Sequence, residues 1–546
     1  MSSDEAARSA LPAMISVPME RRITMMSRWA AALRWPSTWM GGLVLLALAA
    51  LAWGAGGAPL YGTDSWSYLD LAHTIGHHFY QPAALRSFAA PTAFSSAFPP
   101  LWPMALALTG RVFGWHLLNA VWINLLFLAV MAGVAERVAI KRFAAPGAGY
   151  LAALAVISFW PLWDEALGGR SIPLAMLLVT LQVALLARPE ITRTSAGLIG
   201  VLAALIALTR FDGTLLCGLI VLMVFAKTRS WRLAAIAAVA GLVVMAPWML
   251  YCIRHFGTPL RSDDGWIAVS VVQHGTADFF TVPPVDWRQA PLLWAHRMMG
   301  NVGALARTLL LVFRAARATL ALILAVAAAA WARHQRPKPL PSALAIYAVA
   351  LVAATWPLII GSGFTDMRYF ASLVWMLSWM LAIVLATQLR PFAARVPVVA
   401  GLALLFAALI VRDAMHLRAG EQVRAAQQGA QFGRFATLAE CRRRLPPSNA
   451  RIVIAADDFG GEAASFGAIT GISTAPQPTN MLQLSPSDMQ RFAREFAIGW
   501  VYFRDSSEVP FFRQAFRLEP VPNCSLDLRS LHPSDASRAG AAPAIQ

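Results

Sequence analysis

One segment of the sequence combines carboxylates with aromatic and hydroxyl side chains directly after a long apolar run. It reads Tyr61-Gly-Thr-Asp64-Ser-Trp-Ser-Tyr68-Leu-Asp70-Leu-Ala-His73. If the apolar run crosses a bilayer, Asp64 lies just outside it, where its carboxylate could act as a general base on a lipid-borne substrate. The simpler alternative is that Asp64 only caps the helix that Ser65 to His73 would begin, because Asp is a preferred N-cap residue.

Arginine side chains supply a second candidate chemistry. Arg170, Arg210, Arg254 and Arg368 fall at ends of apolar runs, on the side of the membrane that Asp64 would face. The planar guanidinium offers paired donors and stays charged, so it suits a lipid phosphate at that depth. For each of the four, an interfacial or salt-bridged arginine is the alternative.

Histidines beside Asp70 could hold a metal ion. His73, His77 and His78 are spaced so that they can ligate a metal from one helix face. The alternative is a set of interfacial, hydrogen-bonded histidines. The sequence therefore leaves a divalent metal ion as an open possibility.

The composition indicates a polytopic membrane protein. Of 546 residues, 58% are hydrophobic and 13% are charged, and the mean hydropathy is +0.57. Soluble proteins carry more charge than this. The formal net charge of +17 fits membrane topology and anionic headgroups. Because no aromatic-basic motif typical of nucleic-acid binding occurs, we expect no nucleic-acid partner.

About eleven apolar runs approach the length that crosses a bilayer. They are Trp39–Gly54, Trp115–Ala135, Gly149–Leu162, Ile172–Ala187, Ala196–Leu208, Thr214–Ala226, Leu233–Tyr251, Ala318–Ala332, Ser342–Ile360, Ser372–Gln388 and Pro397–Val411. A further apolar stretch, Leu101–Phe113, is interrupted by prolines and is expected to lie in the membrane interface.

The distribution of basic residues predicts the orientation. With the N-terminus in the cytoplasm, all the lysines (Lys141, Lys227 and Lys338) fall in cytoplasmic loops, which is the positive-inside pattern. We therefore expect a cytoplasmic segment over residues 1–36, a transmembrane domain over 37–412, and external loops over 55–114 and 253–317. The expected location is the inner membrane of a bacterium, with the chain after residue 412 in the periplasm.

The composition changes after Val411, where charged and turn residues return. Arg451-Ile-Val-Ile-Ala-Ala and Ile498–Phe503 are typical of buried strands, Leu518–Val521 and Ser525–Leu528 of short ones, and helical patterns lie between them. These elements predict a small extracytoplasmic α/β domain over residues 413–531. The Ala/Pro/Ser-rich residues 532–546 are predicted to be a disordered tail.

Cysteine usage suggests a disulfide in this domain. Cys441 and Cys524 are its only cysteines, and they could pair if the compartment is oxidising. Two free, partly buried thiols are the alternative. Cys217 and Cys252 lie in or beside apolar runs, where a thiol usually packs as a small hydrophobe.

Six short motifs follow one another along the chain in a recognisable order. They are Asp64-Ser-Trp-Ser-Tyr68, Phe98-Pro-Pro-Leu-Trp-Pro103, Gly110-Arg-Val-Phe-Gly114, Leu208-Thr-Arg210-Phe-Asp212-Gly213, Pro247-Trp248 with Arg254-His-Phe256-Gly257-Thr-Pro259, and Met367-Arg368-Tyr369-Phe370. Their order resembles that of the GT-C superfamily of polytopic glycosyltransferases, in which a proline is usual at the position of Phe211. The similarity is greatest to the bacterial branch of aminoarabinose transferases, protein O-mannosyltransferases and RgtA-type sugar transferases, which have an acidic residue in the first external loop.

The resemblance implies a GT-C-like helical membrane fold and transfer of a sugar from a polyprenyl-phosphate donor to a glycolipid, glycan or protein acceptor. Asp64 would be the general base, and direct attack would invert the anomeric carbon. The family often has a second external acidic residue, for which we favour Glu165 over its neighbour Asp164; a solvated loop pair is the alternative. Substrate binding would fall to Glu165, Arg170, Arg210, Arg254 and Arg368, together with Tyr68 and Tyr369 from two of the motifs. Some family members use a divalent metal ion.

Two other kinds of protein share these general features. A lipid-linked glycan flippase or other transporter would also be polytopic and basic, although transporters tend to show internal repeats and charged residues inside their spans. A non-catalytic relative that keeps the fold is the other alternative.

Overall fold

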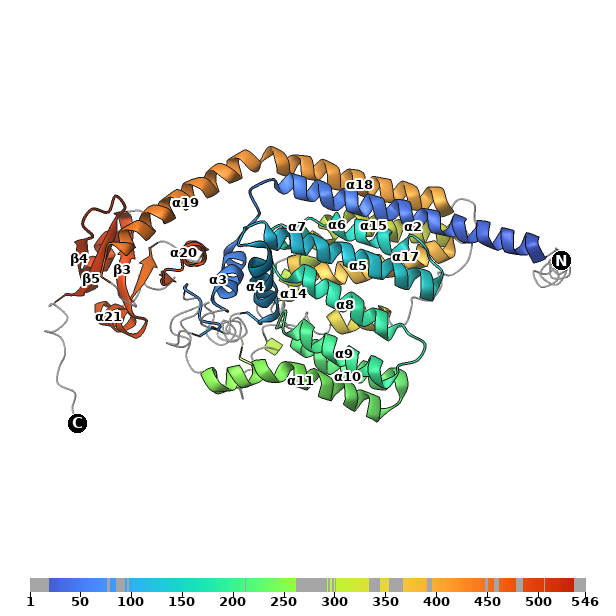
Figure 1. Cartoon of the computed structure of the whole chain (residues 1–546), viewed down its shortest axis with the longest axis horizontal. Coiled ribbons are helices and arrows are strands. Elements are labelled where there is room, and N and C mark those ends of the chain that lie inside the picture. Colours follow the sequence, from blue (N-terminus) through green and yellow to red (C-terminus); the bar gives the residue numbers. More distant parts are fainter. Residues whose placement is uncertain are drawn as a thin grey trace.

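A helical body and a smaller α/β domain follow one another along the long axis of the computed structural model (Figure 1). The structure describes residues 19–75, 79–84, 94–95, 98–211, 213–261, 292, 295–296, 299, 301–332, 344–352, 367–389, 395–446, 450–455, 461–477, 485–504 and 506–534.

The helices of the body are mostly apolar and pack around one shared core. In chain order they are α2 (Met19–Ala55), α3 (Thr63–Thr74), α4 (Leu101–Phe113), α5 (Asn119–Phe143), α6 (Ala148–Ile157), α7 (Pro161–Ala166), α8 (Ile172–Leu186), α9 (Arg193–Ala207), α10 (Gly213–Thr228), α11 (Trp231–Phe256), α14 (Val302–Ala315), α15 (Arg317–Ala332), the 3-10 helix η1 (Met367–Phe370), α17 (Ala371–Gln388) and α18 (Arg395–Ala419).

Five helical segments of the described chain are long and apolar enough to cross a membrane. They are Ser37–Ala55, Asn119–Phe143, Trp231–Phe256, Met367–Gln388 and Pro397–Ala419. The helices Ala306–Ala315 and Arg317–Ala332 meet at an angle of 82° and would count as a sixth only if the pair formed one span. The protein is thus a multi-pass helical membrane protein, while the predicted total of about eleven spans stays a prediction.

Several predicted runs end elsewhere in the structure. The run Gly149–Leu162 is divided, because α6 ends at Ile157 and Pro161 begins the short helix α7. Proline has no N–H to continue the preceding helix and is favoured in a first turn. The run predicted to start at Trp115 instead starts at Asn119 and continues to Phe143. Leu101–Phe113 is helical as expected, and its buried Trp102 faces the core.

Helix α18 continues through the predicted domain boundary at residue 412. It ends at Ala419, and α19 (Glu421–Arg443) begins after the single residue Gly420. The change in composition therefore marks the end of the apolar segment, whereas the helix itself extends further. Figure 1 shows α19 leading from the body to the sheet.

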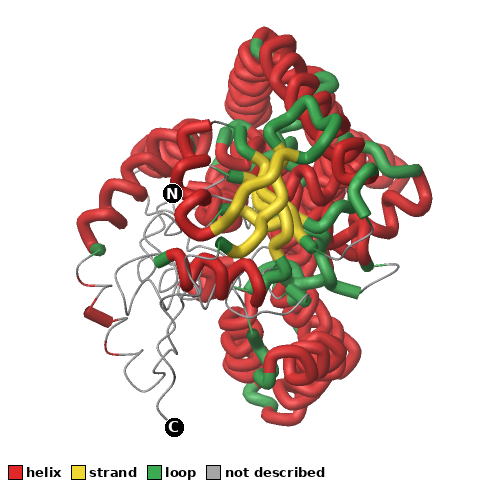
Figure 2. The backbone as a smooth tube through the Cα atoms, turned by 90° about the vertical axis from the view of Figure 1, so that its left-hand side faces the viewer, coloured by secondary structure: helices red, strands yellow, loops and turns green. Residues whose placement is uncertain are grey.

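The C-terminal domain has a five-stranded sheet in the order β2-β1-β3-β5-β4. Its strands are β1 (Arg451–Ile454), β2 (Thr474–Pro476), β3 (Ile498–Tyr502), β4 (Phe516–Pro520) and β5 (Leu528–Pro533). Strands β2, β1 and β3 run parallel, and β5 and β4 complete the sheet in antiparallel fashion. Figure 2 shows this sheet in front of the helical body. The strand predicted at Ser525–Leu528 lies further along the chain, as β5.

Alternating side chains of the strands supply two cores. Ile452 and Ile454 face α19 and α20 (Gly461–Thr470), whereas Val453 faces α21 (Pro486–Glu495) and α22 (Val509–Ala515). This is the period-two alternation of a sheet covered on both faces. A disulfide joins Cys441 of α19 to Cys524, which is the pairing that the sequence suggested.

Candidate active site

Asp64 lies in the first turn of α3, at the end of the body next to the C-terminal domain (Figure 1). The N-cap position belongs to Gly62, and the Gly62 N–H donates to Ser65 Oγ at 3.2 Å. Asp64 is therefore not the N-cap residue, although a carboxylate is favourable near the positive end of a helix. Its side chain remains 24% exposed.

Glu165 occupies a buried position on the short helix α7. Its side chain is 2% exposed, and Arg170 Nη1 donates to Glu165 Oε1 at 3.1 Å. Burial raises the pKa of the Glu165 carboxyl above its usual value, and the guanidiniums of Arg170, Arg368 and Arg210 offset part of that rise. Its neighbour Asp164 is only half-buried.

The turn from Glu165 to Arg170 is held by side chains from neighbouring helices. The Asn124 side chain of α5 donates to the carbonyl oxygens of Glu165 at 3.2 Å and Arg170 at 2.9 Å. Trp102 Nε1 donates to the carbonyl of Gly169 at 3.0 Å, and Gly169 has a φ of 67°, which glycine adopts readily. The sequence analysis missed Asn124; its signal is an amide side chain within an apolar span.

Arg368 joins the two acidic residues. From helix η1, its Nη1 lies 3.1 Å from Asp64 Oδ2 and 3.5 Å from Glu165 Oε1. The two carboxylates thus share one guanidinium although they come from different segments of the chain. The electrostatic strength of such a contact grows where water is partly excluded.

Two tyrosines complete the group. The guanidinium carbons of Arg210 and Arg368 each lie 5.4 Å from the centre of the Tyr369 ring, within cation-π range. The buried Tyr68 hydroxyl lies 3.2 Å from Ser171 Oγ. Burial and the charge of Asp64 raise the pKa of Tyr68, so this hydroxyl stays protonated. Ser171 is another residue that the sequence analysis did not identify.

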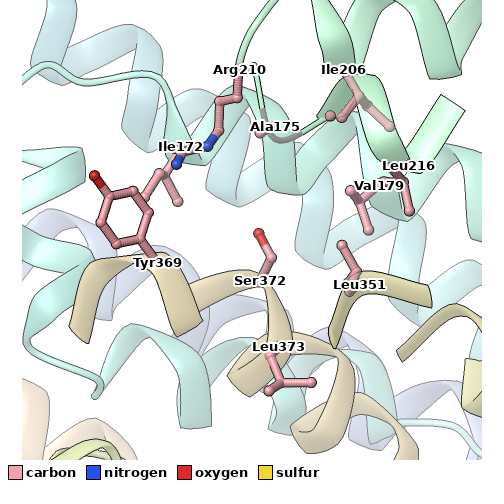
Figure 3. Close-up of a pocket in the computed structure, with 11 residues that line it drawn as sticks. Ile172, Ala175, Val179, Ile206, Arg210, Leu216, Leu351, Tyr369, Ser372 and Leu373 are labelled. Atoms are coloured by element: carbon pink, nitrogen blue, oxygen red, sulfur yellow. The ribbon is translucent and has the colours of Figure 1, made fainter. Parts of the chain in front are cut away.

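A small, largely apolar cavity with a volume of about 40 Å³ lies beside this cluster. Arg210, Tyr369 and Ser372 supply its polar part, and Figure 3 shows the Arg210 guanidinium near Tyr369, with the aliphatic residues farther along. The lining residues are Ile172, Ala175, Val179, Ile206, Arg210, Gly213, Leu216, Leu351, Tyr369, Ser372 and Leu373.

The remaining candidate residues lie outside the cluster or outside the described chain. Arg254 is exposed near the end of α11, and the structure does not bring it to the two carboxylates. His73 packs against Trp115 with ring centres 3.9 Å apart. His77 and His78 lie outside the described residues. Within the described residues, no three His, Cys, Asp or Glu side chains gather as a metal site.

The C-terminal domain holds the other side of α3. The buried Asp70 carboxylate accepts the N–H groups of Ala83 at 3.0 Å and Ala84 at 2.8 Å. The carbonyl of Ala83 in turn accepts the Thr474 N–H at 3.0 Å, next to the edge strand β2, and α20 packs on α3. Burial raises the pKa of Asp70 to about 7. The helix that carries Asp64 is therefore fixed between the body and the C-terminal domain.

Comparison with solved structures shows which fold this is. ArnT from Cupriavidus metallidurans, solved with bound undecaprenyl phosphate, superimposes with a TM-score of 0.53 at 15% identity, over 90% of this chain and 98% of that one. An oligosaccharyltransferase of Archaeoglobus fulgidus, solved with zinc and sulfate, gives a TM-score of 0.50 at 15% identity, over 86% of this chain and 69% of that one. Neither a protein-family model nor a curated protein matches the sequence. The chain has the GT-C fold, which confirms the predicted fold class.

Proposed function

We propose that this chain is a membrane glycosyltransferase that moves a sugar from a polyprenyl-phosphate carrier to a glycolipid, glycan or protein acceptor. The observation that carries the proposal is the position of Arg368 between Asp64 and Glu165, beside Arg210 at the mouth of an apolar cavity. The fold shared with ArnT, whose structure holds undecaprenyl phosphate, supports a lipid phosphate as part of the donor.

The cavity and the arginines match the two chemical parts of such a carrier. The aliphatic side chains of the lining suit an isoprenoid chain, because binding sites are lined mostly by apolar residues. Arg210 and Arg368 both lie 5.4 Å from the centre of the Tyr369 ring and would bind the phosphate through charged hydrogen bonds. Arg170 is engaged with Glu165 and would orient that carboxylate.

Exposure distinguishes the two carboxylates. Asp64 is 24% exposed and can be reached by an acceptor hydroxyl, whereas Glu165 is 2% exposed. We therefore assign Asp64 as the general base and Glu165 as the residue that positions Arg170 and Arg368.

The reaction then follows in one displacement. Asp64 accepts the proton of the acceptor hydroxyl while the oxygen of that hydroxyl forms a bond to the anomeric carbon. The bond from that carbon to the carrier phosphate breaks, and its electron pair stays on the phosphate oxygen, where guanidiniums stabilise the charge. Attack from the face opposite the leaving group inverts the configuration. Because all lysines lie on the predicted cytoplasmic side, we place the reaction at the extracytoplasmic face of a bacterial inner membrane.

The test compares glycolipids and envelope proteins by mass spectrometry in cells that carry the chain, Asp64→Asn or no chain. We expect a sugar-sized mass difference that requires the protein and falls by 10²- to 10⁴-fold in Asp64→Asn, the range for loss of a general base. The control is Asp488→Asn, an exposed substitution on α21 in the C-terminal domain. Full product from Asp64→Asn at equal expression would exclude Asp64 as the base.

A second arm separates a transferase from a transporter. Purified protein in detergent has no sealed compartments, so a transporter has no measurable transport there. Transfer of sugar from a polyprenyl-phosphate donor extract to an acceptor extract in detergent would support the proposal. If no sugar is transferred in detergent, but the protein moves lipid-linked sugar across the membrane of sealed vesicles, the protein is a flippase and the proposal is wrong.

A further inference from the structure

Helix α14 makes a sharp angle with the helix that follows it. It lies immediately before α15, and the two helices meet at 82°. Helix α15 packs against α17, which is long and apolar enough to cross the membrane. A helix nearly perpendicular to such a segment lies close to the plane of the membrane surface.

The side chains of α14 divide into three faces. Thr308, Val312 and Ala315 are buried against the protein, and α14 packs against η1, the helix that carries Arg368. A second, exposed face is apolar and has the spacing of successive helical turns. It consists of Val302, Ala306, Leu310 and Phe313. Leu310 is 69% exposed, more than water would favour for a leucine.

Arginines form the third face, directly beside the apolar one. Arg307 and Arg314 are both exposed and seven residues apart, so they project from the same side of the helix. Arg317 follows at the bend and is also exposed. The sequence contains no Asp or Glu between Asp286 and Asp366. This stretch of chain is therefore purely basic.

We propose that α14 is an in-plane membrane helix that binds anionic phospholipid headgroups. Its apolar face lies among the upper parts of the acyl chains, and Arg307 and Arg314 lie at the level of the lipid phosphates. The occupant is the bilayer itself, because the charge of the arginine face complements an anionic leaflet. Since α14 packs on η1, the bound lipid lies next to the helix that presents Arg368 and Tyr369. The proposal does not depend on sugar transfer.

The position of the helix can be measured with a nitroxide at Leu310→Cys in nanodiscs, with Cys217 and Cys252 replaced by alanine. We expect the label to be accessible to oxygen and protected from a water-soluble nickel complex, as a group below the headgroups is. The same label at Arg494→Cys, an exposed position on α21, provides the aqueous reference. A label at residue 310 as accessible to nickel as the reference would overturn the proposal.

The lipid preference can be measured with a photoactivatable phosphatidylglycerol whose crosslinks are mapped to residues 301–316. We expect phosphatidylglycerol to compete for this crosslink better than phosphatidylcholine. Each arginine near an anionic surface contributes about a 5-fold preference, so R307Q/R314Q should lose roughly 30-fold. The control R494Q/R513Q removes two exposed arginines of the C-terminal domain and should leave the crosslink unchanged. Equal competition by the two lipids, or an unchanged crosslink in R307Q/R314Q, would refute anionic-lipid binding.

Discussion

Glu165 offers the most direct test of how the arginine cluster is held together. The structure places its carboxylate, 2% exposed, within 3.1 Å of Arg170 and 3.5 Å of Arg368. Glu165→Gln keeps the shape of the side chain but removes the negative charge that both guanidiniums face. Two neighbouring positive charges then remain in a site that excludes most water.

The expected loss follows from the burial of each partner. Removing one member of a fully buried ion pair typically costs 3–5 kcal/mol. Arg170 is 16% exposed and Arg368 is 21% exposed, and Arg368 keeps its contact with Asp64 at 3.1 Å. Both guanidiniums can therefore regain some solvation or pairing. We expect the lower end of the range, about 3 kcal/mol of the free energy of unfolding.

The assay is equilibrium unfolding of purified protein in one detergent, followed by tryptophan fluorescence. Asp164→Asn is the matched control, because it removes the same charge from the adjacent, half-buried position. We expect that control to lose less than about 1 kcal/mol, the usual limit for a partly exposed charge. If Glu165→Gln is no less stable than Asp164→Asn, Glu165 does not hold the cluster and the reasoning fails.

Three further expectations concern the surroundings of the cluster. A methyl group at Gly62 would lie 2.6 Å from Arg170 Nη2, so Gly62→Ala should displace that guanidinium and lower sugar transfer at least 10-fold. Gly133→Ala should not lower it, because Gly133 has open space around it. Mass spectrometry of the product tests both variants. Arg210→Gln should weaken binding of a polyprenyl phosphate, measured by isothermal calorimetry, by at least 10-fold, whereas Arg254→Gln, exposed and outside the cluster, should change it less than about 3-fold. The native state holds a proton on Asp70 up to pH about 7, which the unfolded chain releases near its ordinary pKa of 3.8. The contribution of Asp70 to the free energy of unfolding is thus fully present below pH 4 and is lost as the pH rises through 7, by at most about 4 kcal/mol. The unfolding midpoints at pH 5 and pH 8 should therefore differ more in the wild-type protein than in Asp70→Asn. Equal differences in the two proteins would contradict this expectation.

The membrane class and the main members of the cluster could be predicted from the sequence because each has a local signal. Apolar runs and the side on which basic residues fall locate Asp64, Glu165 and Arg368 near the same membrane face. Residues predicted at the same membrane face share one depth in the bilayer, so segments far apart in the chain, such as those of Asp64 and Arg368, can meet there. Arg254 has the same signal, yet it lies apart, because depth in the membrane does not specify which side of the bundle a helix occupies.

Contacts that depend on the rotation of a helix could not be predicted. Asn124 reaches the turn of Glu165 only because α5 presents that amide inward, and the weak amphipathicity of a lipid-embedded helix leaves its rotation unspecified. Pro161 indicates the break between α6 and α7, but the residues on both sides of it are apolar, so the length of the apolar run alone predicts one continuous helix. Similarly, the docking of α20 on α3 joins residues far apart in the chain, and no local pattern encodes such a contact.

The charges of the cluster connect its stability with the proposed reaction. Arg170, Arg210 and Arg368 lie near Asp64 and Glu165 in the cluster. A bound carrier phosphate would compete with Asp64 for Arg368, because both are anions within reach of one guanidinium. If the proposed function is right, binding of the donor thus weakens the contact of 3.1 Å between Arg368 and Asp64. The Asp64 carboxylate then becomes more basic at the step in which it has to remove the acceptor proton. Glu165 stays buried with Arg170 and keeps the site assembled during this exchange. The same ion pairs can therefore hold the site together before the donor binds and release the base afterwards.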